Sequence, residues 1–382
     1  MYNRGTKYLI SGKYLKALSC FKKMLSTNSF KELHLNMGNT YRRLNRDDLA
    51  LSSYLIAAAE STPFADGTYG KYALAINNIG LLHYADGDDS TAMDCYTAAL
   101  ALDPLYGEAV WNYGNAQLRS TNCLKGWDLY EYRFNRGVGS VRIDNSVPRW
   151  DGVTCGDEIC VITEQGLGDK IMFGRYLSCL DKYFSKVVVV CHESLDCLFS
   201  DYECIRDVRG TVSIPICSLA GIFGIVDEHW LDGKFNAKVL EGKNIGVVWS
   251  GSVTHANNVN RSCSPHHFKS LAKYGKLWSL NPTDSYKWIE SSEATTWSDT
   301  ASFILGLDLI VSVDTSIVHL AGTLGVPCLM IQPLRETDFR WGKGVDNVWY
   351  DSVKCIPNKD WDKTFAVIDE LVCNVLKDKN GI

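Results

Sequence analysis

A pattern of small and aromatic residues recurs in the first third of the chain and limits the folds open to it. A glycine is followed 12, 16 and 19 positions later by an alanine, a tyrosine and an alanine. Full copies begin at Gly38 and Gly80, and a shorter one begins at Gly5. Gly80 and Gly114 lie 34 residues apart. A fixed period of this length indicates a repeat architecture, in which each unit buries its apolar face only against its neighbours.

The spacing resembles that of the tetratricopeptide repeat, a pair of antiparallel helices. Small residues allow the paired helices to approach closely, and the aromatic residue fills the gap between repeats. Pro104 ends the second helix of its unit, because proline cannot continue a helix. We therefore predict a repeat array over residues 1–135, with a partial fourth unit from Gly114. We expect the array either to contact a macromolecular acceptor or another subunit, or only to buttress the rest of the chain.

Beyond Trp150 the chain alternates short apolar runs with amphipathic segments. The runs KVVVVC, NIGVVW, DLIVSV and PCLMIQ are typical of buried strands. Strands that alternate with helices predict parallel sheets in α/β domains. The polar segment WLDGKFNAKVLEGK divides them, so we predict two Rossmann-like domains, at 136–240 and 241–382, the second ending in a helix. Ligands bind such domains in a cleft at the carboxyl ends of the strands.

Charge and cysteine usage narrow the function classes. A net charge of −5 does not indicate a nucleic-acid-binding protein, although a local basic groove is compatible with it. The 14 cysteines show no CxxC pair and no zinc spacing, so we expect reduced thiols, no metal and a cytoplasmic protein. We expect no membrane span, because no apolar run approaches the ~20 residues that one needs. Lysine and glycine interrupt the first residues, which argues against a secretory signal.

The loop TEQGLGD follows the first predicted strand of the α/β part. Gly166 and Gly168 permit tight turns there, and Asp169 falls at the start of the next helix. Two interpretations stay open. The carboxylate caps the helix, or it faces the cleft and takes a proton from an acceptor hydroxyl as a general base. We expect Glu164 and Gln165 to border the same cleft.

A second loop carries a candidate phosphate ligand. Trp249, Ser250 and Gly251 lie at the end of the predicted strand that begins GVV, and the loop after them is rich in asparagine and contains Arg261. A planar guanidinium suits a diphosphate, because it donates two parallel hydrogen bonds. The alternative is a solvated loop.

The stretch VDTSIVHLAG forms the third candidate loop. Asp314 ends a strand, and Thr315 or Ser316 caps the next helix, whose free N–H groups favour phosphate oxygens. His319 lies about one turn further on the same face as Thr315, although a lone helical histidine is more often a packing residue. At Gly322 the missing side chain lets a ligand or the sheet come close.

Together the motifs resemble those of tetratricopeptide-containing glycosyltransferases whose catalytic part is similar to the bacterial heptosyltransferases. The matching segments span nearly the whole chain: WDLYEYRF, RWDG, EQGLGDKIMFGRYL, GVVWSGS, SDTASFILGLDLIVSVDTSIVHLAGTLGVP and DFRWG. The resemblance implies the two-domain GT-B fold, a nucleotide-diphosphate sugar as donor and Asp169 as base. It places these residues at the donor diphosphate: Gly251, Arg261, Asp314, Thr315, Ser316 and His319.

The resemblance also implies a reaction without a metal or other cofactor, because a helix start and an arginine stabilise the leaving diphosphate. Asn281 stands where the family usually has glutamine, near the nucleotide, so it bears on base or sugar selectivity.

The acceptor stays open among three classes. Heptosyltransferase-like domains act on lipid-linked glycans, and repeat-fused relatives suggest a protein. The third class is hydroxymethylcytosine in DNA, modified by a phage-type transferase in the host cytoplasm. The basic segments KALSCFKK and YRRLNR would then meet phosphates, and a flipped base would reach Asp169. The acidic net charge argues against DNA. A non-catalytic repeat scaffold is the competing class.

Overall fold

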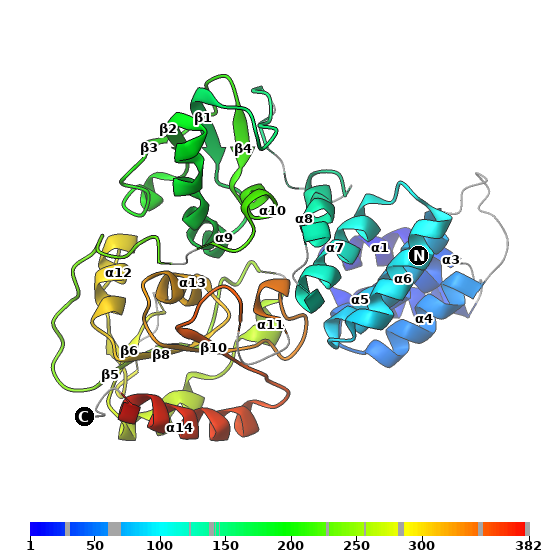
Figure 1. The fold of residues 1–382 in the computed structure, drawn as a ribbon. Helices are drawn as coiled ribbons and strands as arrows, with labels where there is room; N and C mark the ends of the chain where they lie inside the picture. Colours follow the sequence, from blue (N-terminus) through cyan, green and yellow to red (C-terminus); the bar gives the residue numbers. More distant parts are fainter. Residues whose placement is uncertain are drawn as a thin grey trace. The chain divides into compact units, whose positions relative to one another are not determined.

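The computed structural model divides into two compact units, Met1–Ser140 and Val141–Ile382 (Figure 1). The residues that it describes are 1–26, 31–59, 70–121, 124–136, 141, 143–144, 146–226, 229–255, 257–281, 286–342 and 347–378. No helix among them is long and apolar enough to span a membrane.

The described part of the first unit is helical. Its helices are α1 (Tyr2–Ile10), α2 (Tyr14–Leu25), α3 (Lys31–Arg43), α4 (Asp47–Ala59), α5 (Gly70–Ala85), α6 (Asp89–Leu102), α7 (Gly107–Thr121), α8 (Leu124–Tyr130) and η1 (Glu131–Phe134). Helices that follow one another in the sequence pack against each other, as predicted for paired-helix repeats.

The repeated glycines lie where the paired helices come closest. A Cβ atom on Gly80 would lie 2.6 Å from the ring of Tyr96, and Gly5 and Gly38 face the rings of their own repeats in the same way. The 16-residue offset in the sequence is therefore a direct helix-to-helix contact. The fourth unit differs, because the backbone at Gly114 meets Leu129 rather than an aromatic ring.

Asparagine side chains link the odd-numbered helices inside this unit. Asn78 donates to Asn39 at 3.0 Å, and Asn112 donates to Asn77 at 2.8 Å. Asn77, Asn78 and Asn112 are buried. These amides satisfy one another across successive repeats, as buried polar groups must.

The second unit contains two parallel sheets. The first has the order β3-β2-β1-β4 and the second the order β10-β9-β8-β5-β6-β7. The strands of the first sheet are β1 (Gly156–Ile162), β2 (Phe184–Val190), β3 (Glu203–Ile205) and β4 (Ser213–Pro215). Those of the second are β5 (Asn244–Val248), β6 (Lys276–Ser279), β7 (Glu290–Ser291), β8 (Leu309–Val313), β9 (Cys328–Ile331) and β10 (Val353–Ile356). The β5 and β8 strands are buried at every position, as expected for parallel strands covered on both faces.

Short helices connect and cover these strands. They are α9 (Leu167–Phe173), η2 (Gly174–Lys182), η3 (Glu193–Leu195), η4 (Ile216–Ser218), α10 (Leu219–Phe223), α11 (Asn258–Arg261), η5 (Pro265–Lys273), α12 (Trp297–Leu305), α13 (Ser316–Thr323), η6 (Phe339–Trp341) and α14 (Trp361–Asp378). The last helix, α14, packs against the second sheet, since Ile368 and Val372 share a buried cluster with Val247 of β5.

The predicted fold class is confirmed: a helical array precedes an α/β part with two parallel sheets, the arrangement that the GT-B fold requires. The domain boundaries at residues 135 and 240 stay predictions.

Candidate active site

A cavity of about 1470 Å³ lies at the carboxyl ends of strands from both sheets. Its lining comes from the segments after β1, β2, β5, β6, β7 and β8, together with the start of α12 and η6. Its lining includes Gly168, Asp169, Gly251, His255, Arg261, Asn281, Asp314, Thr315, Ser316, His319, Asp338, Arg340 and Trp341. Within each sheet, parallel strands direct their carboxyl-end loops to one edge, and these edges of the two sheets both face the cavity.

Asp169 has both of its carboxylate oxygens engaged. Oδ2 accepts a hydrogen bond of 2.8 Å from the backbone N–H of Gly166, at the start of α9. Oδ1 forms an ion pair with Nη2 of Arg340. The carboxylate therefore caps its helix and lines the cavity at the same time, so the two interpretations of the sequence do not exclude each other.

The loop before α9 is shaped by its backbone. Gln165 adopts a φ of 63°, a left-handed conformation that is uncommon for a residue with a side chain. A Cβ on Gly168 would lie 2.6 Å from Cδ2 of His319, so only glycine allows α9 to approach α13 this closely. Glu164 is buried, and neither it nor Gln165 lines the cavity, unlike our expectation. In this loop the cavity lining therefore begins at Gly166 and continues to Asp169.

Arg261 is a buried cation at the cavity wall. Its Nη1 donates to the backbone oxygen of Asp314 at 3.1 Å, while its Nε has no hydrogen-bond partner among the described residues. Only 9% of the residue is exposed. A Cβ on Gly251 would lie 2.5 Å from Nη2, so the glycine makes room for the guanidinium. Burial lowers the pKa of Arg261, and Asp314 opposes that shift.

The start of α13 carries no side-chain cap. Thr315 holds the N-cap position with extended backbone angles, but its hydroxyl makes no cap hydrogen bond. Its Oγ1 lies 3.4 Å from Oγ of Ser312 instead. The predicted cap by Thr315 is therefore absent, because the side chain turns back toward β8. Orphan N–H groups in a first helical turn attract anions.

Asp314 is a carboxyl group under this helix start. Its Oδ1 accepts a hydrogen bond of 3.0 Å from Nε1 of Trp341. Burial, followed by the nearby Asp338, raises its pKa to about 6, against the pull of Arg261. The carboxyl group of Asp314 therefore keeps its proton to a higher pH than an ordinary aspartate.

His319 is a neutral imidazole held by packing. Its Nδ1 lies 3.0 Å from the hydroxyl of Tyr350, and its ring stacks on Trp341 at 4.8 Å. Burial, followed by the charge of Arg340, lowers its pKa to about 3. The residue is both a packing residue and part of the cavity lining. Gly322 does not line the cavity; it makes room for the ring of Tyr350, so a side chain rather than a ligand approaches it.

Asn281 fixes the loop after β5. Its Nδ2 donates to the backbone oxygen of Ser250 at 2.9 Å, and its Oδ1 accepts from the N–H of Trp249 at 3.0 Å. The amide lines the cavity, yet both of its ends are engaged by backbone. It therefore holds the shape of this wall.

The segment DFRWG supplies site residues for which sequence reasoning proposes no role. Arg340 donates from Nη1 to Oδ1 of Asp338 at 2.7 Å and forms the ion pair with Asp169. Trp341 stacks on His319 and bonds to Asp314. The segment is one of those that carry the resemblance, and its arginine–aspartate pair is the signal that could have revealed it.

No protein-family model matches the sequence, and no curated protein matches it. Among solved structures, a mutant of the Thermobaculum terrenum O-GlcNAc transferase is 12% identical with a TM-score of 0.36, covering 99% of this chain and 92% of that one. The E. coli ADP-heptose LPS heptosyltransferase II is 13% identical with a TM-score of 0.37, covering 59% of this chain and 100% of that one. A glycosyl transferase family 9 protein of Veillonella parvula is 12% identical with a TM-score of 0.38, covering 61% and 100%. A likeness this remote does not show a reaction.

Proposed function

We propose that the chain is a glycosyltransferase that moves a sugar from a nucleotide-diphosphate sugar to an acceptor hydroxyl. One observation carries the proposal. A single cavity holds a buried arginine with an unpartnered N–H, an uncapped helix start and, on the loop from the other sheet, a carboxylate. The first two bind a diphosphate, and the third serves as a base. The cavity exceeds the ~300–1,000 Å³ typical of a small-molecule site, which leaves room for an acceptor group beside the donor.

The diphosphate binds between Arg261 and the start of α13. The guanidinium of Arg261, which lines the cavity, donates to a phosphate oxygen, and the first-turn N–H groups near Ser316 donate to others. When the bond between the anomeric carbon and the phosphate oxygen breaks, the departing nucleoside diphosphate gains negative charge. Fixed donors stabilise that charge as it develops, so no metal ion is required for this step.

Asp169 takes the proton of the acceptor hydroxyl as its oxygen attacks the anomeric carbon. Arg340 holds Oδ1 of this carboxylate in an ion pair. A bound diphosphate offers the guanidinium a second anion, and that competition frees Oδ1 for the proton. Donor binding thus activates the base.

Binding and transfer are tested separately. Nucleoside diphosphates, added one at a time without Mg²⁺ or Mn²⁺, are expected to raise the melting temperature of the full chain. Transfer is then followed by mass with a panel of acceptors: hydroxymethylcytosine DNA, a hydroxyl-bearing peptide and a lipid-linked glycan. A chain that no nucleoside diphosphate stabilises would fit the non-catalytic scaffold instead.

A further inference from the structure

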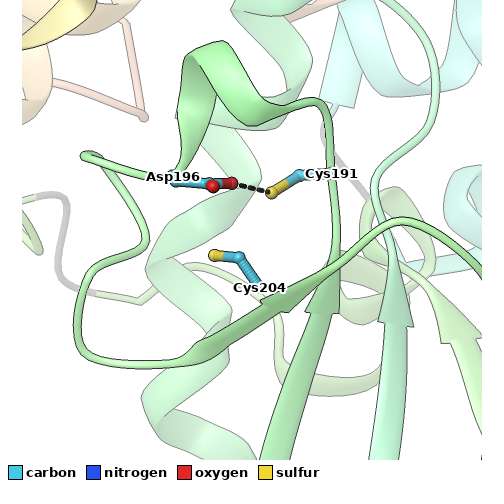
Figure 2. A group of neighbouring side chains, drawn as sticks. All are labelled: Cys191, Asp196 and Cys204. Carbon is cyan, nitrogen blue, oxygen red and sulfur yellow. Dashed lines mark hydrogen bonds between the residues drawn. The ribbon is translucent and has the colours of Figure 1, made fainter.

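Two cysteines and an aspartate come together at one corner of the first sheet, where the sequence shows no metal-binding spacing. Cys191 directly follows β2, Cys204 lies within β3, and Asp196 follows η3 in the loop between them (Figure 2). Their candidate ligand atoms all lie within 4.8 Å of one another. We propose that Cys191, Asp196 and Cys204 bind Zn²⁺ or a chemically similar divalent transition-metal ion.

The sheet register places both thiols on one face. Cys204 pairs with Val189, which lies two residues before Cys191. Side chains two residues apart on a strand point the same way, so both sulfur atoms project from the same side of the sheet. The N–H of Cys191 donates to the oxygen of Ile205 at 3.1 Å, which extends the parallel pairing to this point. The positions are fixed by backbone hydrogen bonds.

The distances suit a tetrahedral ion. Two thiolates bound to zinc at about 2.3 Å lie roughly 3.8 Å apart in a tetrahedron. The three candidate ligand atoms already lie within 4.8 Å of one another. The Cys191 thiol already points at Asp196, with Sγ 3.5 Å from Oδ1 (Figure 2). The ion takes the place of that thiol proton, and the fourth position stays open to water.

Arg206 balances the charge of the complete site. Its Nη1 donates to Oδ1 of Asp196 at 3.0 Å, and its Nη2 pairs with Oδ2. Binding releases two thiol protons to solvent and leaves two thiolates, one carboxylate, one dication and one guanidinium, whose charges sum to zero. A carboxylate has enough lone pairs for a metal and an arginine together, and such outer hydrogen bonds orient metal ligands.

The proposed metal site lies at the two ends of a loop that lines the large cavity. Glu193, Ser194 and Cys197 lie between the first and last ligand and line that cavity. A bound ion would join the two ends of this loop, and anything that binds the folded state alone raises its stability. Ion binding at this corner is independent of the proposed transfer reaction.

The test uses the full chain, stripped with a chelator under a non-metal-binding reductant and titrated with Zn²⁺ alone. Elemental analysis is expected to give about one zinc per chain. Co²⁺ is expected to give a sulfur-to-cobalt absorption band, which reports thiolate ligation directly. Cys191→Ser and Cys204→Ser should each remove the band. Cys197→Ser, in the same loop but outside the cluster, should keep it.

Asp196→Asn separates loss of a metal ligand from misfolding, because it leaves the thiols of both Cys191 and Cys204 in place. It should weaken zinc binding at least tenfold with an unchanged far-ultraviolet circular dichroism spectrum. The proposal is overturned if the wild-type chain binds no zinc, if Cys197→Ser loses the metal as fully as Cys191→Ser, or if Asp196→Asn binds zinc as tightly as the wild type.

Discussion

Arg340 forms an ion pair with Asp169 across 171 positions of sequence, and it holds Asp338 with its other terminal nitrogen at 2.7 Å. One guanidinium thus joins the loop after β1 to the segment after β9. It also stands beside the helix start that we assign to the diphosphate. The guanidinium of Arg340 can therefore pair either with the carboxylate of Asp169 or with a phosphate of the donor.

Asp169→Asn should abolish most of the transfer activity. An amide cannot take a proton, and a positioned general base contributes about 10²–10⁴-fold to a rate. The amide oxygen still accepts the hydrogen bond from Gly166, so α9 keeps its cap. Nucleotide release in the presence of acceptor is the measurement, and stabilisation by nucleoside diphosphate is the control that should persist. Full activity in this variant would remove Asp169 from the base role.

Arg340→Gln should weaken donor binding. The variant loses a cation that phosphate would otherwise recruit, so the KM for the donor should rise by on the order of tenfold. Steady-state kinetics with the donor varied is the measurement. Lys186→Gln is a matched control, since it removes a cation from an exposed ion pair on β2. An unchanged KM and kcat in Arg340→Gln would refute donor-gated release of the base.

Arg261→Lys should bind nucleoside diphosphates more weakly while keeping the positive charge. Lysine lacks the planar fork that donates to Asp314 and to a phosphate at once. Loss of a charge-assisted hydrogen bond costs roughly 1.5–3 kcal/mol, or about ten- to a hundredfold in affinity. Calorimetric titration with the diphosphate that stabilises the wild type measures the change. Equal affinity in the two proteins would place the diphosphate elsewhere in the cavity.

The fold can be predicted from local patterns that the sequence displays openly. The Gly80–Tyr96 spacing is a contact between the two helices of one repeat, and period alone predicts it. Strand ends are equally local, so the amino-acid order alone is enough to assign the loops at Asp169 and Asp314 each to the carboxyl end of its own sheet. Each of these inferences depends only on residues within one repeat or on one strand and the loop that follows it.

The partners of the site residues cannot be predicted in the same way. The Asp169–Arg340 pair depends on how two sheets approach each other, and no period encodes that. The sequence predicts a cap on α13 from Thr315 or Ser316, but Thr315 holds the cap position and its hydroxyl faces Ser312. At Gly322 it predicts space for a ligand or the sheet, whereas the ring of Tyr350 fills that space. The cysteine cluster escapes for a similar reason, since strand register and not spacing brings Cys191 to Cys204.

Gly80→Ala should destabilise the helical unit. The added methyl group would overlap the ring of Tyr96, and such overpacking costs about 1–3 kcal/mol. Thermal unfolding followed by circular dichroism gives the measurement. A second substitution, Tyr96→Leu, removes the ring, so the double variant should recover part of the loss. If Gly80→Ala alone leaves the unfolding temperature unchanged, the close helix contact is not present in solution.

Asp314 should make stability fall as the pH rises from about 4 to about 6. Its carboxyl pKa is raised from 3.8 to about 6 in the folded chain, so the folded state holds a proton that the unfolded state has lost in this range. Stability therefore decreases with pH through this window and levels off above it, by up to roughly 3 kcal/mol. His319 acts in the opposite sense, because its pKa is lowered to about 3 and its charged form belongs to the unfolded chain. The two effects are separated by comparing urea unfolding of the wild type and Asp314→Asn at each pH, since His319 is common to both. From pH 4 to pH 6, the free energy of unfolding of the wild type should fall relative to that of Asp314→Asn. A difference between the two proteins that stays constant over this range would show that Asp314 titrates as an ordinary exposed carboxylate.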